Sequence, residues 1–365
     1  MSDPAPKPGI MAIDAYVGGE SELDGRDQVI KLSSNEGAFG PSPKAQEAYR
    51  QAAGNLHRYP DGGAGALREA IGVRHGLDAA KIVCGAGSDE LISLLCLAYA
   101  GQGDEVLYSE HGFLMYPIAA QVVGAAPVSA PEVELTSHVD SLLQRVSDNT
   151  RLLFLANPNN PTGTYLSGDE MKRLRQELRD DVILVIDAAY AEYATRDDYS
   201  PGIDLVDAAA NVVMTRTFSK IYGLGGARLG WAYCPADIAG VLNRIRGPFN
   251  VSAPAMAAGL AALADVPFTD KARAHNDQWL AWTRKQLLGL GLDVPASAGN
   301  FVLARFPDAR GRNENAAEAA DRFLKDRGII VRAMKSYGLD DCLRITIGRE
   351  DEMHAVIGAL TEFLE

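Results

Sequence analysis

The feature that most constrains the fold is a series of short, continuous apolar runs that alternate with helix-like stretches. Five such runs lie at 81–85, 104–109, 151–157, 181–190 and 211–219. A continuously apolar centre is typical of a strand buried on both faces of a parallel sheet. Two helix-like segments lie between the runs. The segment at 88–101 begins with Ser-Asp, and the segment at 167–181 has Ser167 three residues before Glu170. Both patterns are typical of helix starts. The alternation predicts an α/β fold with right-handed crossovers.

The C-terminal part of the chain follows a less regular pattern. One more strand is predicted at 231–235, and a long helical region is expected from about 252 to 289. Strand-like and helix-like stretches then follow before a closing helix, at 300–306, 316–328, 329–334 and 342–348. We therefore expect a large α/β domain at 41–250 and a smaller α+β domain at 251–365, with an extended N-terminal arm at 1–40 that packs back on the smaller domain.

Composition disfavours several classes of function. A formal net charge of -13 over 365 residues argues against a nucleic-acid or anionic-membrane surface, since both need basic patches. The four cysteines lack Cys-x-x-Cys spacing and the six histidines are scattered, so we expect reduced core cysteines and no metal site. The N-terminus lacks the pattern of a signal peptide, and no apolar run reaches the ~20 residues of a membrane span. These features predict a cytoplasmic protein that acts on small molecules.

Polar, glycine-rich or aromatic clusters follow the carboxyl ends of the first five predicted strands. In chain order they are AGSDE (86–90), HGFLMY (111–116), NPNNPTG (157–163), DAAY (187–190) and FSKIYG (218–223). In open α/β sheets, ligands bind outside the carboxyl ends of the strands. We therefore expect these clusters to converge on one site, although more than a hundred residues separate the first from the last.

The residue types in these clusters predict a ligand with a phosphate and a cationic ring. The AGSDE segment opens a helix, whose free N–H groups suit a phosphate. Thr217, Ser219 and Arg228 can add hydroxyls and a guanidinium to the same phosphate. Asp187 ends an apolar strand, where a carboxylate needs a cationic partner. That partner is either Lys220, in a plain ion pair, or a protonated ring nitrogen, which would leave Lys220 free as a nucleophile.

Together these requirements describe pyridoxal 5'-phosphate as the cofactor. Lys220 would hold it as a Schiff base, Asp187 would keep its ring nitrogen protonated, and Phe113 would stack on the ring. Asn160 and Tyr190 could donate hydrogen bonds to the phenolic oxygen of the ring, which lowers the pKa of the imine. Each motif is weak alone, because NPTG is usually a plain turn. The occurrence of these motifs in this order, each at the end of a predicted strand, favours pyridoxal 5'-phosphate as the ligand.

Three motifs taken together resemble the fold-type-I pyridoxal-phosphate aminotransferases. They are NPNNPTG at 157–163, VIDAAY at 185–190 and TFSKIYGLGGARLG at 217–230. Within that superfamily, four segments resemble the histidinol-phosphate aminotransferase family, namely SSNEGAFGPSP at 33–43, RYPDGG at 58–63, GAGSDELI at 85–92 and CLRITIG at 342–348. The resemblance covers nearly the whole chain. It implies a large domain with a mostly parallel seven-stranded sheet between helices, and a smaller α+β C-terminal domain.

The resemblance implies roles around the cofactor for each matching residue. Lys220 matches the Schiff-base lysine that also shuttles the proton, and Asp187 matches the partner of the ring nitrogen. Asn160 and Tyr190 match the groups on the phenolic oxygen, and Phe113 matches the stacking aromatic. Lys220, Asp187 and Tyr190 are thereby the implied catalytic residues. The residues that match the phosphate cup are Thr217, Ser219, Arg228, Gly87 and Ser88.

The resemblance also implies a homodimer with shared active sites and a set of substrate-binding residues. Tyr59 resembles a tyrosine that reaches the cofactor phosphate of the neighbouring subunit, against which the N-terminal arm would also pack. Arg344 matches the arginine that grips the α-carboxylate of the substrate or its anionic counterpart. Arg332, Tyr16 and Asn35 resemble residues near the substrate.

The implied reaction is transamination between histidinol phosphate and 2-oxoglutarate, which yields imidazole-acetol phosphate and glutamate in histidine biosynthesis. The loop at Gly37–Ala38 departs from the Asn-Glu-Asn-Pro that is usual in the family, which leaves the substrate open. One alternative is an aminotransferase for tyrosine or phenylalanine, and another is a decarboxylase or β-eliminating lyase of the same fold. The acidic chain disfavours a third alternative, the cofactor-sensing module of a transcription regulator.

Overall fold

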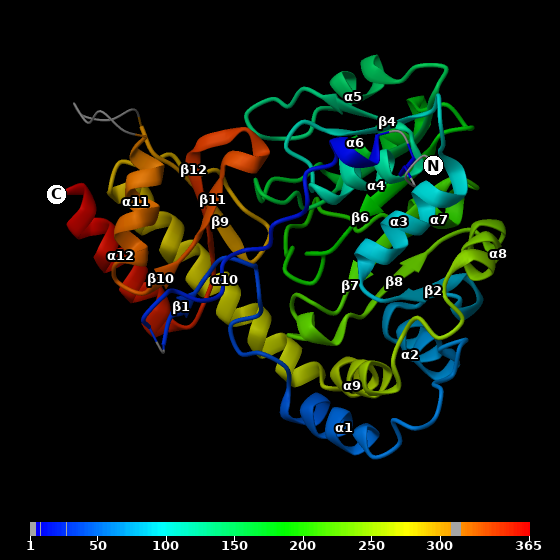
Figure 1. Cartoon of the computed structure of the whole chain (residues 1–365), viewed down its shortest axis with the longest axis horizontal. Coiled ribbons are helices and arrows are strands. Elements are labelled where there is room, and N and C mark those ends of the chain that lie inside the picture. The colour runs from blue at the N-terminus through cyan, green and yellow to red at the C-terminus, as the bar shows by residue number, and fades with distance from the viewer. Residues whose placement is uncertain (1–4, 8, 27, 308–314) are drawn as a thin grey trace.

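The structure, a computed structural model, describes residues 5–7, 9–26, 28–307 and 315–365 and has a larger and a smaller lobe (Figure 1). The larger lobe is built on a seven-stranded sheet, and the smaller lobe on a three-stranded sheet. Helix α10 (Val266–Gly289) runs from the larger lobe into the smaller one.

The large sheet is mostly parallel. Its order is β2 (Ile82–Gly85), β8 (Gly230–Tyr233), β7 (Val212–Thr217), β6 (Ile183–Asp187), β5 (Thr150–Ala156), β3 (Glu105–Ser109) and β4 (Ala126–Ala130). Strand β8 runs antiparallel to both of its neighbours, and every other pair of neighbours is parallel. This confirms the predicted fold class, including the seven strands.

Helices cover both faces of this sheet, which explains the continuous apolar runs. On β6, Val185 packs into one apolar cluster, while Leu184 and Ile186 pack into the other. The face with Val185 is covered by α3 (Ser88–Tyr99), α4 (Met115–Val123) and α8 (Ala236–Ile245). The opposite face is covered by α1 (Pro43–Ala53), α2 (Gly65–His75), α5 (Val139–Arg145), α6 (Gly168–Glu177), α7 (Ile203–Ala208) and α9 (Ala253–Ala264). With no face open to water, every strand position can be apolar.

A local sequence signal sets one of the two predicted helix starts. The Ser167 hydroxyl accepts a hydrogen bond from the backbone N–H of Glu170 at 3.2 Å, as an N-cap does. Helix α3 begins at Ser88 as expected, but its N-cap is Gly87 and no side chain caps it, so the Ser-Asp cap expected from the sequence does not form. The edge strand β4 was not predicted, because its sequence APVSA contains a proline and its residues are partly exposed.

The small lobe has an antiparallel sheet in the order β11 (Arg332–Met334), β12 (Leu339–Thr346) and β9 (Phe301–Arg305). Its apolar core also takes in α11 (Ala316–Lys325), α12 (Glu350–Leu364) and the second half of α10, through Trp279 and Leu287. Short 3-10 turns lie at Ile10–Ala12, Ala79–Lys81, Gly225–Ala227 and Lys335–Tyr337.

The helical region expected from 252 to 289 is two helices rather than one. Helix α9 ends at Ala264, and α10 begins at Val266 with Pro267 in its first turn, where a proline is well tolerated. Buried residues of α9 share the apolar cluster of the large lobe, whereas Trp279 of α10 belongs to that of the small lobe. The chain therefore passes between the lobes along α10. The domain division drawn from the sequence stays a prediction.

The N-terminal segment is attached to the small lobe. Strand β1 (Ile30–Lys31) pairs in parallel with β10 (Ile329–Ile330), and Leu32 is buried in the small-lobe core. Further back along the chain, the Arg332 guanidinium donates a hydrogen bond to the Val17 carbonyl at 2.7 Å. These contacts hold residues 16–26 and 28–36 across the junction of the two lobes, close to the ends of the large sheet (Figure 1).

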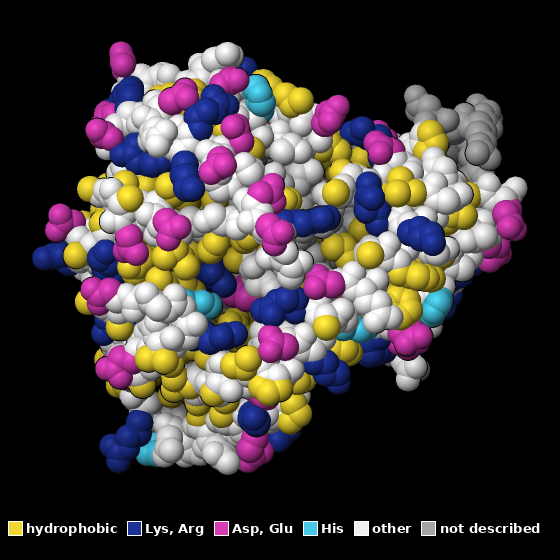
Figure 2. Space-filling view, turned by 180° about the vertical axis from the view of Figure 1, so that it is seen from behind, with side chains coloured by type: hydrophobic (Ala, Val, Ile, Leu, Met, Phe, Trp, Pro, Cys, Tyr) yellow, Lys and Arg dark blue, Asp and Glu magenta, His cyan; other side chains and the backbone are white. Residues whose placement is uncertain are grey.

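On the face opposite to that of Figure 1, the described part of the surface has no large region of a single charge sign. Figure 2 shows acidic and basic side chains interspersed there, with apolar side chains between them. Among the described residues, no helix combines the length and the apolar character needed to cross a bilayer.

Candidate active site

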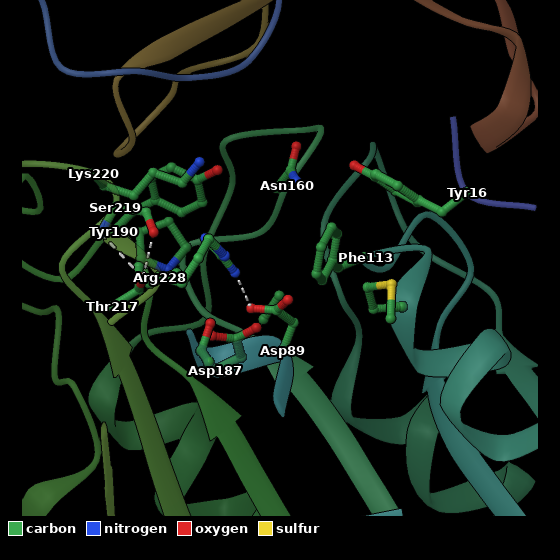
Figure 3. A pocket seen from close by; sticks show the side chains of 15 residues that line it. Tyr16, Asp89, Phe113, Asn160, Asp187, Tyr190, Thr217, Ser219, Lys220 and Arg228 are labelled. Atoms are coloured by element: carbon green, nitrogen blue, oxygen red, sulfur yellow. Dashed lines mark hydrogen bonds and ion pairs between the residues drawn. The ribbon is translucent and has the colours of Figure 1, made fainter. Parts of the chain in front are cut away.

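A cavity of about 320 Å³ lies at the carboxyl ends of β5, β6 and β7 (Figure 3). In Figure 3, Lys220 and its neighbours lie across the cavity from Phe113 and Tyr16. The predicted site residues that line it are Tyr16, Ser88, Phe113, Asn160, Asp187, Tyr190, Thr217, Ser219, Lys220 and Arg228. The structure thus brings together clusters from five strand ends. Gly87, Asn35 and Arg344 lie behind this lining, and Arg332 and Tyr59 lie further away, as described below.

One corner of the cavity has the features of an anion site. The first turn of α3 begins there at Ser88, and the Thr217 hydroxyl donates to the Ser219 hydroxyl at 3.0 Å. Arg228 enters the same corner in an ion pair with Asp89, at 2.7 Å. Gly87 has a φ of 93°, and a Cβ on it would lie 2.3 Å from the Arg228 guanidinium. Only glycine therefore allows the guanidinium to approach the helix N-terminus this closely.

Asp187 is buried at the end of β6, with 5% of its surface exposed. Its carboxylate accepts hydrogen bonds from the hydroxyls of Tyr116, at 2.9 Å, and Thr215, at 3.1 Å. Burial raises the pKa of the Asp187 carboxyl, while these two hydrogen bonds and the nearby Lys220 charge act to lower it. A cation placed in the cavity would meet this carboxylate.

Lys220 follows β7, and its ammonium group is not paired with Asp187. Its Nζ donates a hydrogen bond to the Ser34 carbonyl at 3.3 Å and lies 5.5 Å from the centre of the Tyr190 ring. Burial, followed by the positive charge of Arg344, lowers the pKa of Lys220 to about 8. Among the described residues no ion pair joins Lys220 to Asp187, so the simple ion-pair interpretation does not hold. A neutral amine is therefore accessible near physiological pH.

Tyr190 and Asn160 each keep a hydrogen-bond donor for a ligand in the cavity, because their oxygen atoms already accept hydrogen bonds from the protein. The Tyr190 hydroxyl oxygen accepts from Nδ2 of Asn35 at 2.8 Å, which leaves its own O–H to donate. Burial raises the pKa of Tyr190 to about 12, so this proton is retained. Oδ1 of Asn160 accepts a hydrogen bond from Arg344, which leaves the Asn160 amide nitrogen as a donor.

Arg344, on β12, is a buried cation with 6% of its surface exposed. Its Nη2 donates to the Ser33 carbonyl at 2.7 Å, Nη1 donates to Asn160, and Nε has no partner among the described residues. Burial lowers the pKa of Arg344, although a guanidinium stays charged. A buried charge without an acidic partner is costly, so an anionic ligand would be stabilised next to it.

Tyr16 and Arg332 form the outer edge of this region. Tyr16 is half exposed, and its ring packs edge-on against Phe113 with the centroids 6.4 Å apart. Arg332 does not line the cavity, because its guanidinium holds the backbone carbonyls of Val17 and Gly18. Arg332 therefore fixes the N-terminal segment that carries Tyr16.

Tyr59 lies outside the cavity of its own chain. It is 83% exposed and stacks on Phe249 with ring centroids 4.6 Å apart. This exposed aromatic pair is accessible to a second molecule.

Three residues of the site were missed by sequence reasoning. Asp89 pairs with Arg228, and Tyr116 and Thr215 both bind Asp187. Asp89 stands beside Ser88 in a segment that was already assigned to the site, so helix position could have identified it. Tyr116 also stands in a segment assigned to the site, HGFLMY, but nothing in the sequence indicates that its hydroxyl reaches Asp187 from α4.

Comparisons with known proteins agree on one family. Residues 27–360 match the family described as aminotransferase class I and II. The histidinol-phosphate aminotransferase of Paramagnetospirillum magneticum is 63% identical over 364 residues, which cover 100% of this chain and 99% of that protein. The enzyme of the same name from Rhodospirillum rubrum is 61% identical over 361 residues, which cover 99% of this chain and 97% of that protein.

The fold agrees with a solved structure as well. Histidinol-phosphate aminotransferase from Sinorhizobium meliloti, solved in complex with pyridoxal-5'-phosphate, superposes with a TM-score of 0.90 at 30% sequence identity. The match covers 100% of this chain and 98% of that one. The chain belongs to the class I and II aminotransferases.

Proposed function

We propose that this aminotransferase uses pyridoxal 5'-phosphate to transfer the amino group between histidinol phosphate and 2-oxoglutarate, giving imidazole-acetol phosphate and glutamate. The observation that carries the proposal is the meeting of Lys220, Asp187 and the Arg228 corner in one cavity. The names of relatives that are 61% and 63% identical over nearly the whole chain support the substrate.

The described residues fit the proposed cofactor at each end of the cavity. The Arg228 corner, with the first turn of α3 and the hydroxyls of Thr217, Ser219 and Ser88, would hold the phosphate. The buried Asp187 carboxylate would hold a protonated ring nitrogen. Phe113 would stack on the ring, and the free donors of Asn160 and Tyr190 would bind its phenolic oxygen.

Lys220 is the group that moves the proton. When bound, the cofactor would supply an electron sink that stabilises negative charge at the substrate Cα. Because its pKa is lowered to about 8, Lys220 Nζ can take the Cα proton as a neutral amine and later return it. The Tyr190 hydroxyl, held by Asn35 and close to Lys220, would help to orient the cofactor ring. We propose Lys220, Asp187 and Tyr190 as the catalytic residues.

Arg344 would bind the anionic part of both substrates. Glutamate has an α-carboxylate and histidinol phosphate has none, so one cation must serve either a carboxylate or a phosphate. The planar guanidinium of Arg344 can pair with both, and its unpartnered Nε is a further donor. Tyr16 and Asn35 lie near this point, and Arg332 would act through the N-terminal segment that it holds.

We further propose a homodimer in which Tyr59 reaches the cofactor phosphate of the partner subunit. The support is the exposure of Tyr59, 83%, outside the cavity of its own chain. The N-terminal arm would pack on the same partner. The cytoplasmic location expected from the sequence stays a prediction; the four cysteines are buried free thiols.

The proposal is tested by a half-reaction. The cofactor-loaded protein is titrated with histidinol phosphate, tyrosine or phenylalanine in the absence of a keto acid, and the absorbance of the bound cofactor is followed. We expect histidinol phosphate to convert the cofactor at the lowest concentration, and 2-oxoglutarate to restore it. A preference for tyrosine or phenylalanine would show instead that the protein is an aminotransferase for aromatic amino acids. Release of CO₂ or ammonia without an acceptor would contradict transamination.

A further inference from the structure

A buried tyrosine that was not named among the predicted site residues contacts the central carboxylate. Tyr116, the second residue of α4, is 0% exposed, and its hydroxyl donates to Oδ2 of Asp187 at 2.9 Å. The Thr215 hydroxyl donates to the other oxygen, Oδ1, at 3.1 Å. Each carboxylate oxygen therefore has a donor from the protein and retains lone pairs for a group in the cavity.

Aromatic neighbours fix the position of the Tyr116 ring. It stacks on Phe154 with centroids 4.8 Å apart and an interplanar angle of 7°. It also meets Phe113 edge-on, at 5.9 Å and 89°. Both arrangements are favourable for aromatic pairs. Since the ring cannot tilt without breaking these contacts, its hydroxyl is held on the Asp187 carboxylate.

We propose that Tyr116 is a positioning residue that keeps Asp187 ionised and aimed at the ring nitrogen of the cofactor. The inference rests on the proposed function, because it takes pyridoxal 5'-phosphate as the occupant of the cavity. Tyr116 contacts both Phe113, which would stack on the ring, and Asp187, which would bind its nitrogen. One side chain thereby sets the relative positions of two groups that the cofactor must meet together.

The electrostatic balance at Asp187 depends on this contact. Burial raises the pKa of the Asp187 carboxyl, and the hydrogen bond from Tyr116 is foremost among the interactions that lower it. Burial and the adjacent carboxylate raise the pKa of Tyr116 well above its ordinary value, so its hydroxyl remains a donor at working pH. The titratable groups that act on Asp187 are Tyr116 from α4, Asp89 from α3, Lys220 after β7, and Tyr190 and Tyr199, both after β6.

The test compares Tyr116→Phe with the wild-type protein by measuring the dissociation constant of pyridoxal 5'-phosphate across a pH series, from the quenching of intrinsic fluorescence. Removal of the hydroxyl disfavours the ionised carboxyl, so the pKa of Asp187 rises. We expect the loss of affinity on acidification to begin about one pH unit higher than in the wild type. The matched control is Tyr108→Phe, which removes a hydroxyl from a ring 6.4 Å from that of Tyr116 and leaves the hydrogen bonds of Asp187 in place.

A double-mutant cycle separates positioning from plain packing. If Tyr116 acts through the carboxylate, Tyr116→Phe should weaken cofactor binding in the wild-type background and have little further effect in Asp187→Asn. An equal loss in both backgrounds would overturn the proposal. Replacement of Tyr116 by 3-fluorotyrosine covers the case in which Tyr116→Phe folds poorly. Its more acidic phenol donates more strongly, so the acid transition should move to lower pH.

The outcomes also separate this proposal from the proposed function. If the wild-type protein binds the cofactor and transaminates, but Tyr116→Phe keeps the wild-type affinity and pH transition, only the role of Tyr116 is wrong. If the wild-type protein does not bind the cofactor, the proposed function is wrong.

Discussion

At the scale of single residues, the two central ionisable groups do not form an ion pair, although Asp187 is buried and Lys220 is half-buried in the same cavity. The Asp187 carboxylate is held by the hydroxyls of Tyr116 and Thr215, and Lys220 donates to the Ser34 carbonyl. A closed ion pair would stabilise the ammonium and keep the pKa of Lys220 high. Burial without that partner has the opposite effect and brings the pKa of Lys220 to about 8. The arrangement therefore leaves a carboxylate for a cationic ring and an amine for proton transfer.

The first prediction concerns the amine itself. Lys220→Ala and Lys220→Arg should each lower kcat at least about 100-fold, because neither side chain can accept a proton from the substrate Cα near neutral pH. Steady-state transamination with histidinol phosphate and 2-oxoglutarate measures the loss. The control is Lys172→Ala, which removes an exposed lysine of α6. Turnover by Lys220→Ala at the wild-type rate would contradict the assignment.

The second prediction uses the lowered pKa of Lys220 and needs no cofactor. The ammonium form dominates below about pH 8 and the nucleophilic amine above it, so acylation of Lys220 in cofactor-free protein should rise through a midpoint of about 8. An unburied lysine titrates near 10.4. Mass spectrometry of the Lys220 peptide after brief acetic anhydride treatment measures the rate at each pH, with the Lys172 peptide as the reference. Parallel pH curves for the two peptides would show that burial does not activate Lys220.

At the scale of helices and strands, the sequence predicted what depends on local patterns. Continuous apolar runs marked the strands, and the polar residues after them, such as Asp187 and Lys220, were placed at one edge of the sheet by topology alone. Contacts that join distant elements carried no such pattern. The hydroxyl of Tyr116 reaches Asp187 across 71 positions, and Arg332 binds a carbonyl at residue 17. Their partners are set by tertiary packing, which one sequence does not display.

The third prediction concerns an ion pair that ties β7 to the loop after β6. Arg216 and Glu192 are 4% and 8% exposed and are joined at 2.7 Å. Glu192→Gln would leave the Arg216 charge buried without compensation, which costs about 3–5 kcal/mol of unfolding free energy. Urea denaturation of the cofactor-free protein measures the cost. Asp351→Asn, which breaks an exposed pair with Arg349, should cost no more than about 1 kcal/mol. Equal losses in the two variants would show that the buried pair does not tie these elements together.

At the scale of the whole molecule, the cavity collects side chains from both lobes but leaves Tyr59 outside. Arg344 comes from the small lobe and Lys220 from the large one, so a single chain supplies the amine and the buried cation. Tyr59 stacks on Phe249 at the surface, with Leu56 also exposed nearby in the sequence. In a two-fold symmetric dimer, a face of this kind would meet its own copy, and each Tyr59 could then complete the site of the partner subunit.

The fourth prediction tests this sharing by mixing two defective subunits. Tyr59→Ala alone should weaken cofactor binding about tenfold, the effect of one hydrogen bond to a charged phosphate, and Lys220→Ala alone should be inactive. The two variants are co-expressed with different affinity tags, and the mixed dimer is isolated by selection for both. One of its two sites then combines an intact Lys220 with an intact Tyr59, but only if the tyrosine comes from the partner subunit.

The mixed dimer should therefore bind cofactor at one site with wild-type affinity and turn over at half the wild-type rate per dimer when the cofactor is limiting. If Tyr59 does not contribute to the site of the partner subunit, the site with the intact Lys220 in the mixed dimer would still lack a tyrosine. Activity per dimer at limiting cofactor would then be half that of Tyr59→Ala. A measurement of mass in solution would not distinguish a shared site from two subunits that merely associate, because both dimers have the same mass. The mixed dimer distinguishes them, because its activity depends on which chain supplies the phosphate contact.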